Sequence, residues 1–228
     1  MSALTPDEEL QEACVRFRDD PLAYTLFMYD WGHESLVGWD GPDEWHREVF
    51  QCIKEYLGGA EDSPLCIAIA SGHGAAKTTL MAWLVLWFMS CRPHPQVVVT
   101  ANTESQLNTR TWRELAKWHK LASNKGWFEW TATSFYLKAH PETWKANAIP
   151  WSENNSEAFA GTHEESVLVG FDEASKISDK IFEVTDGIFT TKKNIWIVAG
   201  NGTRNSGRFY ECFNKHKRRW KTWNIDSR

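Results

Sequence analysis

The sequence predicts an α/β protein in which helices cover both faces of a mainly parallel sheet. Four short runs, at 65–70, 96–100, 167–171 and 194–199, are apolar throughout or apolar apart from polar residues at their ends. Continuous apolar runs of this length are typical of strands that are buried on both faces. Stretches with helical character separate these runs, and the alternation of strands and helices indicates a parallel sheet.

The chain has 228 residues, a length that suits one large domain or one domain with a small appendage. Residues 1–40 are predicted to form a peripheral segment, with a helix over 7–18 and an aromatic, irregular stretch over 24–39. Residues 41–228 are predicted to form the domain that contains the sheet.

A helix is predicted directly before the first strand. The turn at 41–43 supplies Asp43 as its N-cap, and apolar residues from Trp45 to Leu57 recur at helical spacing. The glycine pair at 58–59 is expected to end it.

The other elements follow from local patterns. A capping-box sequence opens at Thr103. Apolar and polar residues alternate over 128–138, as in the exposed strands of a hairpin. The predicted elements are helices at 77–90, 103–121 and 207–217, a hairpin within 128–138, a polar loop at 152–162, and a last strand at 220–225.

The composition limits the classes of function. The net charge of −5 argues against a surface that is positively charged throughout, as in many nucleic-acid-binding domains. The basic run at 215–219 leaves a local contact with DNA phosphates open, although a solvated face is the commoner explanation. Most of the 14 tryptophans are expected in the core.

Membrane and metal-cluster roles are not indicated. No apolar run approaches the roughly 20 residues of a membrane-spanning helix, and the first residues lack the features of a signal peptide. The five cysteines are scattered without a CxxC pair, which is typical of reduced thiols in a cytoplasmic protein.

The stretch Ser71-Gly-His-Gly-Ala-Ala-Lys77-Thr78-Thr79 lies between the first predicted strand and a helix. It approximates the GxxxxGK[ST] pattern of a phosphate-binding P-loop, in which small residues let backbone N–H groups surround phosphates. The N-terminus of the helix adds partial positive charge. Lys77 is therefore predicted to reach the β- and γ-phosphates of a nucleotide, and Thr78 to bind Mg²⁺.

Two positions depart from that pattern. Ser71 stands at its first glycine and Ala76 at its second, and an alanine fits there only if its backbone avoids positive φ. On its own the stretch also fits a small-residue turn before a surface lysine. The predicted nucleotide-binding residues are Ser71, Gly72, His73, Gly74, Ala75, Ala76, Lys77, Thr78 and Thr79.

The third strand ends in an acidic pair, Asp172-Glu173, which is the arrangement of a Walker B motif. Asp172 is predicted to hold Mg²⁺, directly or through water. Glu173 is predicted to orient and polarise the attacking water. A pair of acids that caps a turn is the alternative, but the P-loop upstream favours the catalytic interpretation.

Two further candidate sites have weaker support from the sequence. The loop 200–207 follows the fourth strand and should emerge beside the phosphates, where Asn201 could sense the γ-phosphate or its water. A plain glycine- and asparagine-rich loop is the alternative. Trp45 and His46 could contact the base of the nucleotide, although Trp45 serves equally well as an apolar anchor of its helix.

Together these motifs resemble the ATPase domain of the large terminase subunit of tailed bacteriophages, from about residue 41 onwards. The resemblance implies a P-loop NTPase of the additional-strand, catalytic-glutamate class with a RecA-like sheet. In that family the domain hydrolyses ATP to drive double-stranded DNA into a procapsid, and a C-terminal nuclease cuts the DNA. The segments that carry the resemblance are Gly41-Pro-Asp-Glu-Trp45, Ser71-Gly-His-Gly74, Thr100-Ala-Asn-Thr103, Glu157-Ala-Phe-Ala-Gly161, Val169-Gly-Phe-Asp-Glu-Ala-Ser175, Gly200-Asn-Gly-Thr-Arg204 and Gly207-Arg-Phe-Tyr210.

Carried over to this chain, the resemblance assigns roles to five residues. It makes Lys77 and Thr78 the Walker A pair and Asp172 the metal-binding acid. It makes Glu173 the catalytic glutamate and Asn201 part of the motif that couples hydrolysis to movement. ATP and Mg²⁺ are the implied ligands.

Three positions differ from residues that are common in the family. His46 stands where a glutamine often reads adenine, His73 where many relatives carry an arginine, and Ala160 where some relatives carry one. An arginine finger from a neighbouring subunit must then come from elsewhere, and Arg204 and Arg110 are the candidates.

The resemblance also implies partners: double-stranded DNA, a portal protein, the small terminase subunit, and further copies of the chain in a ring, with a monomer possible in isolation. The implied location is the host cell cytoplasm, without a membrane. No acidic cluster of a nuclease follows, so a truncated motor domain without nuclease activity is expected. Two other functions stay open: another DNA-dependent P-loop ATPase, and a nucleotide-bound assembly module that does not hydrolyse.

Overall fold

The computed structural model describes residues 4–226 apart from 61, 73, 152–164 and 190–192. The described residues form one eight-stranded sheet in the order β3-β4-β5-β2-β6-β7-β1-β8. Neighbouring strands from β5 to β8 in this order are parallel, and β3, β4 and β5 pair antiparallel. The strands are β1 Leu65–Ser71, β2 Gln96–Thr100, β3 Phe128–Trp130, β4 Ser134–Leu137, β5 Lys145–Ala148, β6 Val167–Phe171, β7 Ile195–Gly200 and β8 Trp220–Ile225.

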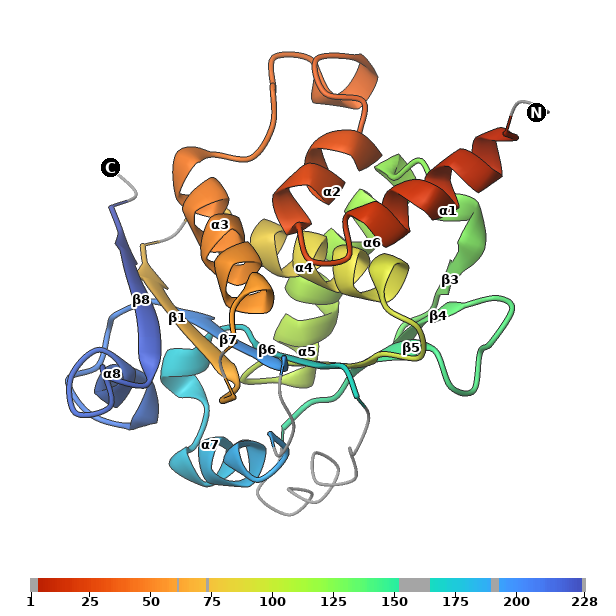
Figure 1. Cartoon of the computed structure of the whole chain (residues 1–228). Helices are drawn as coiled ribbons and strands as arrows, with labels where there is room; N and C mark the ends of the chain where they lie inside the picture. Colours follow the sequence, from red (N-terminus) through yellow and green to blue (C-terminus); the bar gives the residue numbers. More distant parts are fainter. Residues whose placement is uncertain (1–3, 61, 73, 152–164, 190–192, 227–228) are drawn as a thin grey trace.

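Helices cover both faces of this sheet, as Figure 1 shows, with α1 to α4 and α6 over one face and α7 and α8 on the other side. The predicted α/β class with a mainly parallel sheet is therefore confirmed. The helical segments are α1 Pro6–Arg16, α2 Pro21–Met28, η1 Glu34–Leu36, α3 Glu44–Gly58, α4 Lys77–Cys91, α5 Glu104–Gln106, η2 Leu107–Trp112, α6 Arg113–Leu121, η3 Lys125–Trp127, η5 Ala174–Lys176, α7 Asp179–Asp186 and α8 Arg208–Cys212.

The strand order places β7 between β1, which precedes the P-loop stretch, and β6, which precedes the acidic pair. A strand inserted between those two is what the additional-strand class requires. All four strands predicted from continuous apolar runs are present, each within one residue of its expected bounds.

Helix α4 is the centre of the larger core. Its side chains from Leu80 to Cys91 are buried on every side of the helix, between the sheet below and the other helices above. At Gly170 of β6, an added Cβ would lie 2.3 Å from Met81 Sδ, so the helix packs directly on the strand. Close packing of this kind fixes the P-loop end of α4 relative to the acidic pair that follows β6.

The first 40 residues contribute to that core. Tyr24 and Met28 of α2 are fully buried, and the Tyr24 hydroxyl donates to the Leu86 carbonyl of α4 at 3.2 Å. The boundary between a segment 1–40 and a domain 41–228 therefore remains a prediction.

Some local predictions were wrong. The stretch expected to be irregular from residue 24 begins inside α2, which starts after the N-cap Asp20, whose carboxylate accepts from Ala23 N at 3.0 Å. Strand β5 and helix α7 were not predicted, and α8 ends at Cys212 instead of near residue 217. The predicted loop at 152–162 lies outside the described residues.

The helix predicted over 103–121 begins at the Thr103 cap, whose hydroxyl accepts from Gln106 N at 3.1 Å. It then passes through a π-helical turn, η2, before continuing as α6. Turns of this type frequently occur at functional sites. In the described part of the chain, no helix combines the length and the apolar character that crossing a bilayer requires.

Candidate active site

The predicted motifs meet at one edge of the sheet. Strands β1, β6 and β7 are parallel neighbours, so their carboxyl ends lie side by side. Ser71 ends β1, Asp172 follows β6, and Asn201 follows β7. In parallel sheets this edge is where ligands bind.

The Lys77 side chain connects two of these motifs. Its Nζ donates to Ser71 Oγ at 2.6 Å, Gly72 O at 2.8 Å and Asn201 Oδ1 at 3.0 Å. Burial lowers the pKa of Lys77, and the carboxylates at 172 and 173 oppose this shift. The lysine predicted to bind phosphates and the predicted coupling asparagine are therefore in direct contact.

Three donors hold the Asp172 carboxylate. Thr78 Oγ1 donates to its Oδ2 at 3.1 Å, Thr111 Oγ1 donates to the same oxygen at 2.6 Å, and Glu173 N donates to Oδ1 at 2.9 Å. Asp172 is only 5% exposed. A buried carboxylate needs such donors, since an unpaired charge there would be costly.

A hydroxyl beside a carboxylate is a donor set that fits Mg²⁺, which binds a few protein oxygens and completes its shell with water and phosphate oxygens. Thr78 and Asp172 supply this pair of oxygens. Among the described residues no group of three or more His, Cys, Asp or Glu side chains could enclose a metal ion by itself. The site therefore fits a cation that is shared with a phosphate ligand.

Glu173 has an unusual backbone and two cationic partners. Its φ of 52° and ψ of 39° lie in the left-handed region, which costs a non-glycine residue about 1–3 kcal/mol. Its carboxylate contacts the Arg110 guanidinium and accepts from Lys176 Nζ at 2.9 Å. Strained residues of this kind cluster at functional sites.

Ala76 is also left-handed, with φ 54° and ψ 28°. The expectation that an alanine here needs a backbone without positive φ is therefore not met. His46 Nε2 lies 3.3 Å from the Ala76 carbonyl and, as the donor, holds this residue in place from α3.

The His46 side chain is only 1% exposed. Burial lowers its pKa to about 4, so the ring is neutral at pH 7 and forms no ion pair with Asp43, whose Oδ2 lies 3.6 Å from Nδ1. Its ring packs on Trp45 and against Trp83. This position favours support of the loop over contact with a base, and the adenine-reading role of His46 stays a prediction.

Two adjoining clefts open at this edge. One, of about 510 Å³, is lined by Ser71, Gly72 and Asn201. The other, of about 610 Å³, is lined by Trp45 and Ala75, and both clefts share residues 224–226 at the end of β8. An elongated ligand could therefore extend from the loop at 71–77 towards Trp45.

Other predicted residues lie apart from this arrangement. Thr79 Oγ1 donates to Glu114 Oε1 of α6 at 2.8 Å and so turns away from the loop. Arg204 is exposed and forms no ion pair with any side chain that the structure describes. His73, Ala160 and the segment 157–161 lie outside the described residues.

Three contributors escaped prediction. Thr111 holds Asp172, Lys176 holds Glu173, and Glu114 ties α6 to α4. None belongs to a sequence motif, because each reaches the site only through the packing of its helical segment. The Ala-Ser-Lys sequence directly after the acidic pair was the single local signal for Lys176.

No protein-family model matches the sequence. The chain is 27% identical over 195 residues to a probable large terminase subunit of Enterobacteria phage P7, an alignment that covers 83% of this chain and 38% of that protein. The chain therefore spans well under half the length of this curated relative.

Solved structures share the fold. The HK97 bacteriophage large terminase superposes with a TM-score of 0.66 and 14% identity over 92% of this chain and 44% of its own. The Thermus phage P74-26 large terminase ATPase domain gives 0.56 and 12% over 80% of each chain. A large terminase from a thermophilic bacteriophage, in complex with ADP, gives 0.54 and 13% over 71% of this chain and 39% of its own. The resemblance to the large terminase ATPase domain is thus confirmed in sequence and in fold.

Proposed function

We propose that the chain is the ATPase domain of a viral DNA-packaging motor and hydrolyses ATP with Mg²⁺ at the edge formed by β1, β6 and β7. One observation carries the proposal: Thr78 Oγ1 lies 3.1 Å from the buried Asp172 carboxylate, beside Lys77 and Asn201. The similarity to large terminases, one of them in complex with ADP, supports it.

The phosphates of ATP would be held by the loop 71–77 and the start of α4. This helix of 15 residues presents its N-terminus to the loop, and its partial positive charge favours a phosphate. Lys77 adds a full charge at the same place. Trp45, which lines the neighbouring cleft, is the better candidate for contact with the base, because His46 is buried.

Thr78 and Asp172 would hold Mg²⁺, which when bound neutralises charge on the transferring phosphate. Thr111 keeps the Asp172 carboxylate in place by donating at 2.6 Å. Asn201 accepts from Lys77 Nζ, so any movement of that lysine is passed directly to the loop that follows β7.

Glu173 would orient the attacking water and accept its proton. Arg110 and Lys176 fix the direction of its carboxylate. Because Arg110 is already paired within its own chain, the exposed Arg204 is the better candidate for an arginine that acts on a neighbouring subunit.

The test measures phosphate release by the wild type, Lys77→Ala and Glu173→Gln. Glu173→Gln should lose about 10²–10⁴-fold in turnover while it still binds ATP, because the lost group acts in catalysis. Lys77→Ala should lose nucleotide binding as well. Lys54→Ala, a change on the exposed side of α3, is the control. Unchanged turnover in both site variants, with an active wild type, would refute the assignment.

A mixing experiment addresses the arginine finger. Lys77→Ala and Arg204→Ala subunits should each be inactive when assembled alone, and a mixed ring should regain activity if Arg204 acts across an interface. An isolated domain can be slow without a neighbour, since an arginine finger contributes about 10³–10⁵-fold. Packaging of double-stranded DNA by the full-length subunit with procapsids, portal and small subunit would test the biological role.

A further inference from the structure

A groove of about 950 Å³ lies between α6 and the β3–β4 hairpin, away from the candidate active site. Four cationic side chains line it, namely Arg113, Lys120, Lys125 and Lys138, against one acid, Glu129. In a chain with a net charge of −5, this concentration of positive charge is a local exception.

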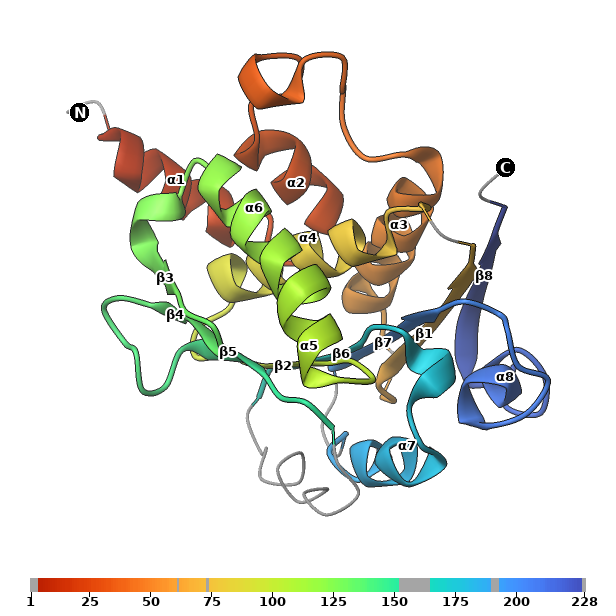
Figure 2. The same cartoon turned by 180° about the vertical axis from the view of Figure 1, so that it is seen from behind.

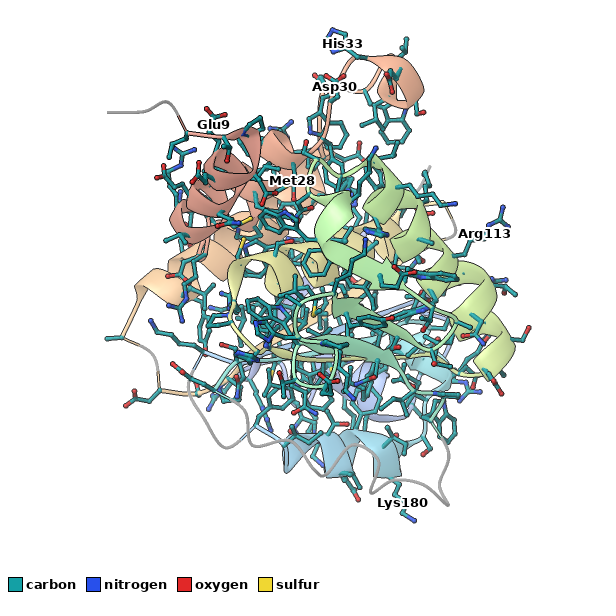
Figure 3. The ribbon with its side chains drawn as sticks, turned by 90° about the vertical axis from the view of Figure 1, so that its right-hand side faces the viewer. Glu9, Met28, Asp30, His33, Arg113 and Lys180 are labelled. Carbon is teal, nitrogen blue, oxygen red and sulfur yellow. The ribbon has the colours of Figure 1, made fainter. Side chains whose placement is uncertain are left out.

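These four charges are not compensated. All four residues are exposed, and no acidic side chain in the described ranges forms an ion pair with any of them. Figure 3 shows Arg113 projecting from its helix away from the body of the protein. His119 lies among them, and its pKa is lowered by burial first and then also by Lys138 and Lys120. The cations are thus close enough to act on a common group.

The two aromatic residues of the groove, Phe128 and Trp130, are buried and half-buried respectively. Phe128 is buried and stacks on Phe135 with ring centroids 4.9 Å apart. Trp130 donates its indole N–H to the Trp112 carbonyl at 3.2 Å. Binding of single strands relies on base stacking on exposed aromatic faces, and neither aromatic side chain of this groove is exposed. Exposed cations beside buried or half-buried aromatic side chains fit the phosphates of a duplex.

We infer that this groove binds the phosphate backbone of double-stranded DNA, without regard to its sequence. The inference rests on the proposed function, because it names the surface through which a DNA-packaging ATPase would contact its substrate.

The groove is connected to the acids of the active site by one helical segment. The run α5–η2–α6, in front in Figure 2, carries Arg113 in the groove. Two residues before it, Thr111 donates to Asp172, and one residue earlier Arg110 contacts Glu173. A force that bound DNA exerts on Arg113 would therefore act within one helical turn of the residues that contact both acids.

The hairpin is locked to the same turn. Trp112 donates its indole N–H to the Thr131 carbonyl at 2.7 Å, while Trp130 donates back to the Trp112 carbonyl at 3.2 Å. This reciprocal pair joins the two walls of the groove at η2. The walls are thus expected to move together when DNA is bound or released.

The basic run at 215–219 is the competing surface. It precedes β8, at the edge of the sheet opposite β3. Part of its charge is neutralised, since Arg219 pairs with Asp186 at 2.6 Å. Lys217 and Arg218 remain exposed there and provide a matched control.

The test measures fluorescence anisotropy of a labelled 30-base-pair duplex at several salt concentrations. The groove variant is Arg113→Gln with Lys120→Gln, and the control is Lys217→Gln with Arg218→Gln. The groove variant should lose about tenfold or more in affinity for the duplex at low salt. Its negative slope of log affinity against log salt should become shallower by about 2. The control should stay close to the wild type, and two duplexes of unrelated sequence should behave alike.

Three results would overturn the inference: an unchanged affinity and slope in the groove variant, a loss in the control instead, or tighter binding of a single strand than of the duplex. A second groove variant, Lys125→Gln with Lys138→Gln, must show the same loss of affinity and the same change of slope. Thermal unfolding by circular dichroism checks that each variant is folded. Phosphate release is measured on the same wild-type protein. An active ATPase with an unaffected groove variant would refute only the groove, while a groove-dependent duplex affinity without hydrolysis would refute only the ATPase.

Discussion

Replacing Ala76 with glycine should stabilise the protein, although it removes a methyl group next to Lys77, the lysine proposed to bind phosphate. The backbone of Ala76 is left-handed, with φ 54° and ψ 28°. Its carbonyl is held from two sides, by Leu80 N at 3.1 Å as the first turn of α4 and by His46 Nε2 at 3.3 Å. The residue therefore cannot relax to a right-handed conformation without breaking these contacts.

The magnitude follows from two opposing contributions. A left-handed conformation costs a residue with a Cβ about 1–2 kcal/mol. Glycine avoids this cost but gains freedom in the unfolded chain, which offsets about 0.4–1 kcal/mol. The net expectation for Ala76→Gly is a gain of about 0.5–1 kcal/mol, which corresponds to an increase of about 1–4 °C in Tm for a domain of this size.

The neighbouring Ala75 provides the control, because its φ is not positive. Ala75→Gly should only add freedom to the unfolded chain and should lower stability by about 0.4–1 kcal/mol. The two variants thus have opposite predicted signs in urea unfolding and in thermal unfolding. A loss of stability in Ala76→Gly equal to that in Ala75→Gly would refute the strain argument.

Three further predictions concern the same edge of the sheet. Thr111→Val should cost about 1.5–3 kcal/mol in urea unfolding, because it removes a buried donor to the Asp172 carboxylate. Gly200→Ala should cost about 1–3 kcal/mol, because its Cβ would lie 3.0 Å from the backbone nitrogen of Ser175. His46 has a folded-state pKa of about 4, below its unfolded value, so the unfolded chain binds the proton first as the pH falls. The contribution of His46 to the free energy of unfolding is therefore fully present above about pH 6.5. That free energy should drop by about 2 kcal/mol between pH 7 and pH 5.

Each of these has its own control. Thr111→Ser keeps the hydroxyl and should retain most of the stability that valine loses. Gly202→Ala adds a Cβ where no atom lies within 4 Å and should be nearly neutral. His46→Gln should flatten the pH dependence, and an equally steep profile in that variant would assign the acid sensitivity to other groups.

The strands of the sheet centre were predictable because they are buried on both faces. Such strands are apolar except at their ends, so β1, β2, β6 and β7 stood out without knowledge of the fold. Strand β5 did not, because its sequence alternates polar and small residues, and its place is determined by pairing with β2 and β4.

Some residues of the candidate active site were likewise predictable from the sequence, and others were not. Asp172 and Asn201 follow directly from strands, and Lys77 is separated from β1 by a short loop. The parallel topology therefore predicted that they would meet, and the structure has Lys77 Nζ 3.0 Å from Asn201 Oδ1. Thr111 follows no strand and belongs to no motif. It lies in the π-helical turn η2, from which its buried hydroxyl donates to Asp172. Residues recruited by helix packing of this kind cannot be read from spacing alone.

Strand β1, which precedes the loop proposed to bind phosphate, has β7 and β8 as its two neighbours in the sheet. Both come from the last part of the sequence, 195–200 and 220–225, while β1 itself ends at residue 71. During synthesis on the ribosome, this strand must wait for its partners until residue 225 has emerged, and contacts between such distant segments form slowly. Under the proposed function, the nascent chain would thus be unable to bind a nucleotide until these strands have paired.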